Sequence, residues 1–129
     1  MDVGVTLPPL RLEVTPTMVV STALATRDFQ DVHHDRDAAV RRGGRDIFLN
    51  ILTTTGLVQR YVTDWAGPSA VIKSIGLRLG VPWYAYDTVT FKGEVTAVED
   101  GLITVKVVGS NSLGDHVIAT STLTIEGNA

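Results

Sequence analysis

Four stretches in the second half of the chain alternate between apolar and polar side chains with a period of two. They cover residues 75–79, 89–97, 103–107 and 117–125. This period is typical of β-strands that bury one face, and turn-forming residues at 99–101 and 113–115 separate the last three stretches. Successive strands joined by short turns pair as antiparallel sheets. The sequence therefore predicts a four-stranded antiparallel sheet with one buried face.

The segment from Asp46 to Trp65 has a helical period instead. Its apolar stripe falls three or four residues apart and consists of Ile47, Ile51, Thr54, Val58, Tyr61 and Trp65. The run of residues 53–56, TTTG, has low helix propensity, but burial outweighs propensity in a packed helix. We therefore predict one helix over residues 46–64, beginning near Asp46. Because this helix would be apolar on most faces, we expect the sheet to wrap around it.

The N-terminal third of the chain gives weaker signals. Residues 1–17 hold three of the five prolines, which indicates an irregular arm. Residues 18–25 are a candidate strand, and residues 18–129 are expected to form a single domain. Asp35 or Asp37 suits the cap of a short helix that runs to about residue 42, where two glycines would end it.

Composition argues against several classes of function. The chain has 129 residues and a net charge of −3, which fits one domain with no basic patch for nucleic acid. It contains no cysteine, so disulfides and thiolate metal sites are excluded and a reducing cytoplasm fits. The N-terminus does not resemble a signal peptide, and no apolar run is long enough to span a bilayer. We therefore expect a cytoplasmic protein that binds neither nucleic acid nor membrane.

Residues 27–37, RDFQDVHHDRD, gather two of the three histidines and four carboxylates. Neighbouring side chains rarely converge on one ion and no second ligand cluster is present, so a metal site is disfavoured. A solvated loop leading into a capped helix accounts for most of the stretch, His34 included. The third histidine, His116, is isolated on a predicted strand and is expected at the surface.

Asp28 and His33 allow another interpretation. They lie five residues apart with Phe29 and Val32 between them, and a short turn could fold both side chains toward one pocket. A carboxylate and an imidazole that share one water can give and take protons together, and histidine titrates near neutral pH. Spacing alone leaves both a proton-transfer pair and an ordinary loop open.

The pattern as a whole resembles the MaoC-like, hotdog-fold hydratase family. The family's signature is matched, in order, by Asp28, Phe29, His33, Asp35 and Ala38-Ala39. Residues 62–65 and 86–95 are also similar to the family, and the resemblance extends over about residues 18–125. More closely, three segments resemble the short MaoC-like subunits of steroid-side-chain enoyl-CoA hydratases of cholesterol-degrading actinobacteria. They are VSTALATRDFQDVHHDRD, GLVQRYVTDWAGPS and GLRLGVPWYAYDTVTF.

The departures from the family pattern fall around the site. Arg27 stands where glycine is common, Gln30 and Asp31 stand where Asn-Pro is common, and Leu49-Asn50 replaces a common His-Gly pair. These positions bear on the shape of the loop and on the identity of the oxyanion donor.

The resemblance implies an α+β hotdog fold, a long central helix wrapped by a curved antiparallel sheet. It implies that Asp28 and His33 are catalytic and add water across the double bond of a 2-enoyl-CoA, here a steroid with a shortened side chain. The backbone N–H of Asn50, at a helix N-terminus, is the candidate oxyanion donor. No metal or other cofactor is implied, because hydration is redox-neutral and CoA is part of the substrate. Several aromatic residues are candidates for a pocket, with core packing expected for at least three of them: Tyr61, Trp65, Trp83, Tyr84 and Tyr86.

The resemblance also implies a partner. We expect an α2β2 assembly with a longer subunit that carries a second MaoC-like half and a DUF35 domain, with a thiolase-like aldolase as a candidate further partner. The sequence leaves two other functions open. One is an acyl-CoA thioesterase, since the hotdog fold hosts many. The other is a non-catalytic subunit that completes the active site of another chain.

Overall fold

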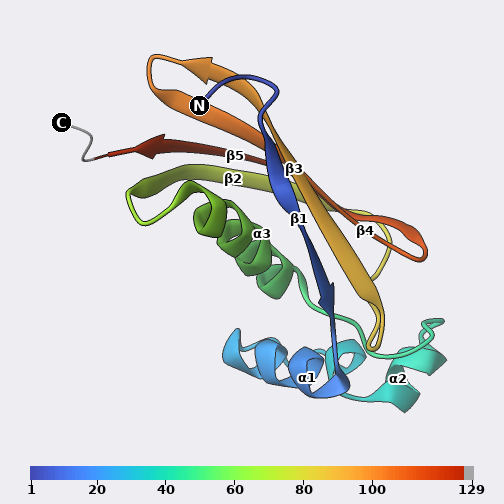
Figure 1. Cartoon of the computed structure of the whole chain (residues 1–129). Coiled ribbons are helices and arrows are strands. Elements are labelled where there is room, and N and C mark those ends of the chain that lie inside the picture. The colour runs from blue at the N-terminus through green and yellow to red at the C-terminus, as the bar shows by residue number, and fades with distance from the viewer. Residues whose placement is uncertain (127–129) are drawn as a thin grey trace.

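A five-stranded antiparallel sheet forms the body of the protein (Figure 1). The computed structural model describes residues 1–126. Its strands are β1 (Thr6–Glu13), β2 (Ala70–Leu79), β3 (Thr88–Glu99), β4 (Leu102–Asn111) and β5 (Gly114–Ile125), in the spatial order β1-β3-β4-β5-β2. Every pairing is antiparallel. The four strands predicted from alternation are confirmed as β2 to β5.

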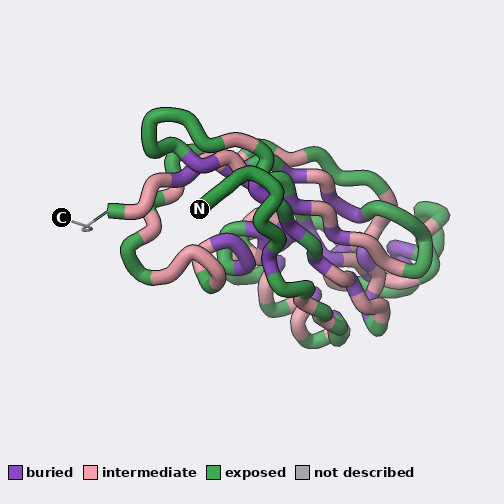
Figure 2. Tube along the Cα trace, turned by 45° about the horizontal axis from the view of Figure 1, so that its top comes forward, coloured by how far each residue is buried: buried purple, intermediate pink, exposed green. Residues whose placement is uncertain are grey.

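Helix α3 (Ile51–Ala66) lies across one face of this sheet. Val58 and Val62 are fully buried, and the ring of Tyr61 lies 5.8 Å from that of Phe91 on β3. In Figure 2, buried positions recur along the strands in the middle of the molecule. The predicted long helix is therefore confirmed, and burial of its apolar face outweighs the low propensity of the threonine run.

The predicted start of this helix at Asp46 is wrong. Residues 47–49 are extended and pair with residues 83–85, through the bonds Ala85 N–H to Ile47 O and Leu49 N–H to Trp83 O, each 3.0 Å. This pairing buries Ile47 and Leu49 without a helix. The helix begins only after Asn50, whose side-chain oxygen accepts the N–H of Thr53 as an N-cap.

Two predictions for the N-terminal region are also wrong. Residues 18–25 lie in helix α1 (Pro16–Ala25), which is capped by Thr15, starts on a proline and buries Val19 and Ala23, four residues apart. The arm over residues 1–17 is not irregular, because eight of its residues form β1, which pairs with β3. Its two adjacent prolines fall between Leu7 and Leu10, where the register shifts at the edge of the sheet.

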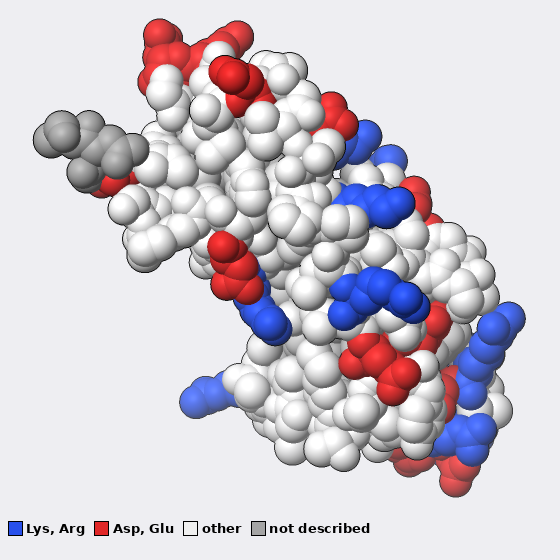
Figure 3. All heavy atoms as spheres, in the orientation of Figure 1, with Lys and Arg blue, Asp and Glu red and all other residues white. Residues whose placement is uncertain are grey.

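The short helix after the histidines is confirmed as α2 (Arg36–Arg41), with Asp35 as its N-cap. A single 3-10 turn, η1 (Asp31–His33), precedes it. In Figure 1, α1, η1 and α2 lie together beside the N-terminal end of α3. None of the helices in residues 1–126 is long and apolar enough to cross a membrane. On the face shown in Figure 3, acidic and basic side chains are interspersed.

Candidate active site

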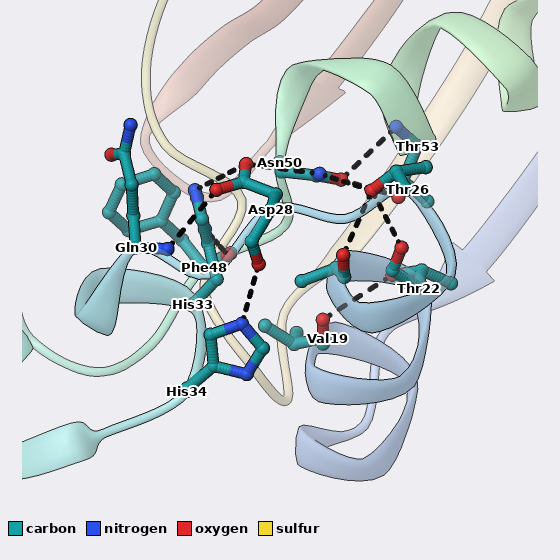
Figure 4. Close-up of polar contacts among 11 residues, drawn as sticks. Val19, Thr22, Thr26, Asp28, Gln30, His33, His34, Phe48, Asn50 and Thr53 are labelled. Carbon is teal, nitrogen blue, oxygen red and sulfur yellow. Dashed lines mark hydrogen bonds and ion pairs between the residues drawn. The ribbon is translucent and has the colours of Figure 1, made fainter.

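The loop after α1 is held in shape around Asp28. Its amide donates to the carbonyl of Ala23 at 2.8 Å, and its own carbonyl accepts from His34 Nε2 at 2.6 Å. Arg27, just before it, has a left-handed backbone with φ of 56°. The prediction that His34 is merely a solvated loop residue is therefore wrong, because its half-buried imidazole fixes the backbone of Asp28 (Figure 4).

Asp28 and His33 are brought together as predicted. His33 is buried on η1, and its Nε2 lies 3.4 Å from Oδ2 of Asp28. On the other side of the ring, His33 Nδ1 donates to the carbonyl of Phe48 at 2.7 Å. Because a carbonyl can only accept, the hydrogen belongs on Nδ1, and in the uncharged imidazole Nε2 is left as an acceptor facing Asp28.

The Asn50 side chain is a third member of this group (Figure 4). Its amide nitrogen donates to Oδ2 of Asp28 at 3.2 Å and to the hydroxyl of Thr26 at 2.8 Å. Only the backbone N–H of Asn50 was predicted to matter, and in residues 1–126 that N–H donates to no other protein group. The preference for asparagine as an N-cap was the sequence signal for its side chain.

These contacts keep the Asp28 carboxylate charged. Burial alone raises the pKa of this carboxyl, but the hydrogen bonds from the Asn50 amide and the Gln30 N–H, with the nearby His33 and His34, outweigh burial. The pKa of Asp28 therefore lies below its ordinary value of 3.8, and the group is ionised at neutral pH. It can accept hydrogen bonds from a water or take up a proton.

The pair faces a cavity of about 300 Å³. One wall is formed by Asp28, Gln30, His33, Phe48, Leu49 and Ile51, and the other by residues 79–82 and His116. None of the five aromatic candidates lines this cavity. Trp83 and Tyr61 are buried in the core and Trp65 packs against it, as expected for at least three of them. Tyr86 is 68% exposed.

The prediction that His116 lies at the surface is wrong. Ser110 on β4 pairs with Asp115 and Gly109 pairs with Val117, so His116 is the extra residue of a β-bulge, which turns its side chain inward. Its Nδ1 donates to the carbonyl of Val81 at 2.8 Å, and its Nε2 accepts from the hydroxyl of Thr54 at 2.9 Å. His116 thus ties α3 to the opposite wall of the cavity.

Two of the remaining acidic groups of the stretch 27–37 have partners of their own, and Asp37 is exposed on α2. Asp35 caps α2, and Asp31 forms an ion pair with Arg42 at 3.1 Å. In residues 1–126 no three histidine or acidic side chains lie together as a metal site would require. The acidic groups around the pair therefore serve the local structure of the loop.

A long helix packed against one face of a curved antiparallel sheet, with a polar pair near the helix N-terminus, is the architecture of the hotdog class. No protein-family model matches the chain. The chain is 79% identical over 123 residues to the 3-oxo-4,17-pregnadiene-20-carboxyl-CoA hydratase beta subunit of Mycobacterium tuberculosis, and the match covers 95% of each protein.

Solved structures agree with this comparison. A chain in the crystal structure of the ChsH1-ChsH2 complex from Mycobacterium tuberculosis is 78% identical, with a TM-score of 0.94 over 97% of this chain and 98% of that one. The (R)-hydratase from A. caviae involved in PHA biosynthesis is 18% identical, with a TM-score of 0.89 over 98% of both chains, and shares the fold. The chain belongs to the MaoC-like hydratase family. The predicted family and hotdog fold are confirmed.

The buried His116 generates a prediction for stability. Burial lowers the pKa of His116 below 6.5, although its bond to Val81 opposes this shift. The unfolded chain therefore binds a proton more readily, so the contribution of His116 to stability is complete above pH 6.5 and is lost as the pH falls. Between about pH 7.5 and pH 5.5, the free energy of unfolding should fall by up to about 1.4 kcal/mol in total, the most that one proton can contribute over the single pH unit below 6.5.

The measurement is urea unfolding of the wild type and of His116→Asn across this range. The variant should be less stable at neutral pH but should lose less stability on acidification. Parallel pH dependences for the two proteins would contradict the assignment.

Proposed function

We propose that this chain is the catalytic beta subunit of an enoyl-CoA hydratase, acting on the CoA thioester of a steroid with a shortened, unsaturated side chain. The observation that carries the proposal is the Asp28–His33 pair facing the cavity. The steroid substrate rests on the name of the relative that is 79% identical. A cytoplasmic location fits a CoA substrate and a chain without cysteine.

The geometry suits the addition of water. When His33 is uncharged, the Asp28 carboxylate and Nε2 of His33 are both acceptors and lie 3.4 Å apart, so one water can donate a hydrogen to each. As the water oxygen bonds to the β-carbon, one of the pair takes its proton. A proton from the pair then reaches the α-carbon on the same face, so that H and OH are added across the double bond.

Negative charge develops on the thioester oxygen during this attack. The backbone N–H of Asn50, at the start of α3, is the proposed donor to that oxygen, because it lies at the positive end of the helix dipole. A single donor of this kind typically lowers the barrier by about 3–4 kcal/mol. This role requires the backbone only and is separate from that of the Asn50 side chain.

The functional unit is proposed to be a hetero-oligomer. The 78% identical chain of known structure is part of a two-component complex, ChsH1-ChsH2. In this chain β2 is an end strand of the sheet, and no strand within residues 1–126 pairs with its outer edge. We propose an α2β2 assembly with a longer MaoC-like/DUF35 subunit, to which a thiolase-like aldolase binds.

The catalytic roles predict the effect of two substitutions. Asp28→Asn and His33→Ala should each lower kcat by about 10²–10⁴-fold, because each removes one of the two groups that bind the water. The double variant should be little worse than either single variant, as expected for groups that act as a unit. The assay is loss of enoyl-CoA absorbance by the assembled enzyme, with free CoA measured in parallel.

Asp37→Asn is the matched control, because it makes the same chemical change at an exposed position of α2 and should retain activity. If both site variants keep wild-type turnover, catalysis resides on the partner and this chain is its scaffold. If free CoA is released and no hydration is detected, the enzyme is a thioesterase.

Assembly is predicted to be required for turnover. The chain expressed alone should be poorly soluble or inactive, and co-expression with the longer subunit should yield a complex of the two that hydrates enoyl-CoA. Size-exclusion chromatography with mass detection, followed by the assay, tests this. Full activity of the purified single chain would overturn the proposed assembly.

A further inference from the structure

The Asn50 side chain joins three elements at the site. It is buried, with 2% of its surface exposed, and every polar atom of its amide is used. The nitrogen donates to Asp28 and Thr26, and the oxygen accepts from the backbone N–H and the hydroxyl of Thr53. The loop that carries Asp28, the end of α1 and the first turn of α3 therefore meet at one amide group.

The orientation of this amide is determined by its neighbours. The Thr53 N–H can only donate, so the Asn50 oxygen must face it. The Thr26 hydroxyl donates to the carbonyl of Thr22 at 2.8 Å, which leaves its oxygen to accept from Asn50. A flipped amide would place its oxygen against the Asp28 carboxylate and lose these bonds. The nitrogen is therefore directed at Asp28.

The same carboxylate oxygen, Oδ2 of Asp28, contacts both the Asn50 amide and His33 Nε2. The other oxygen, Oδ1, accepts from the Gln30 N–H at 3.3 Å. With both oxygens held, the carboxylate has a fixed plane relative to the imidazole. Preorganisation of this kind matters for catalysis because displacement of a reacting group by about 1 Å can cost about 100-fold in rate.

We propose that the Asn50 side chain is a positioning residue, which fixes the Asp28 carboxylate as the charged acceptor for the hydration and couples it to the first turn of α3. The inference rests on the proposed function and deepens it. It assigns the side chain a role distinct from that of the Asn50 backbone N–H.

Asn50→Gly separates the two roles, because glycine keeps the backbone N–H and removes the amide. In the assembled enzyme, kcat should fall by about 10- to 100-fold, as for loss of one hydrogen bond to a charged group, with little change in KM. Without the amide the pKa of Asp28 rises, so the acidic limb of the kcat–pH profile should move to higher pH.

Asn50→Asp is the second variant, because it keeps an oxygen to cap α3 but places a carboxylate beside Asp28. Like charges raise the pKa further, so this variant should move the acidic limb more than Asn50→Gly does. Thr15→Gly is the matched control for loss of a helix cap. It should lower stability and leave the pH profile unchanged.

An unchanged acidic limb in both Asn50 variants would overturn the proposal, even if their stability falls. If the Asn50→Gly variant does not assemble with the partner, the kcat–pH profile of Asn50→Asp alone tests the proposal, and an unchanged acidic limb in that variant overturns it. Failure of the proposed function can be distinguished from failure of this inference, because in the former case Asp28→Asn would also retain activity.

Discussion

The pairing of residues 47–49 with residues 83–85 is the constraint on which the site depends. It keeps the chain extended until Asn50, so that α3 begins beside the loop that carries Asp28. It also presents the Phe48 carbonyl to His33 and places Leu49 in the core. If the helix began at Asp46, Phe48 would be helical and Asn50 would lie inside the helix, where neither contact is available.

Much of the fold could be predicted from the sequence, because periodicity reports burial directly. The four alternating stretches became β2 to β5, and the long helix formed despite its threonines. The wrong predictions concern segments whose secondary structure is determined by tertiary pairing. Residues 18–25 are apolar enough for either a strand or a helix, and only the Thr15 cap and the burial of Val19 with Ala23 identify the helix. The prolines of residues 1–17 indicate an irregular arm, although this segment contains the edge strand β1.

The residues of the site also fall into those that local sequence signals predict and those that depend on tertiary pairing. The spacing of Asp28 and His33, together with the family signature, identified both residues from the sequence, and the structure brings them within 3.4 Å. His116 could not be placed, because a single bulge in β5 reverses the direction of its side chain. The sequence does not predict the role of the Asn50 amide, because that role depends on where α3 begins. The predicted start of the helix, at Asp46, is five residues before the observed one. The sequence predicts no more than a loop residue at His34, because its hydrogen-bond partner is a backbone carbonyl.

The proposed hydration requires that Asp28 and His33 together bind the water that adds to the β-carbon. The most direct measurement is a crystal structure of the assembled enzyme with the hydrated product bound. We expect the new β-hydroxyl within about 2.6–3.2 Å of both the Asp28 carboxylate and His33 Nε2. A β-hydroxyl held by groups of the partner subunit, with Asp28 and His33 out of reach, would contradict it.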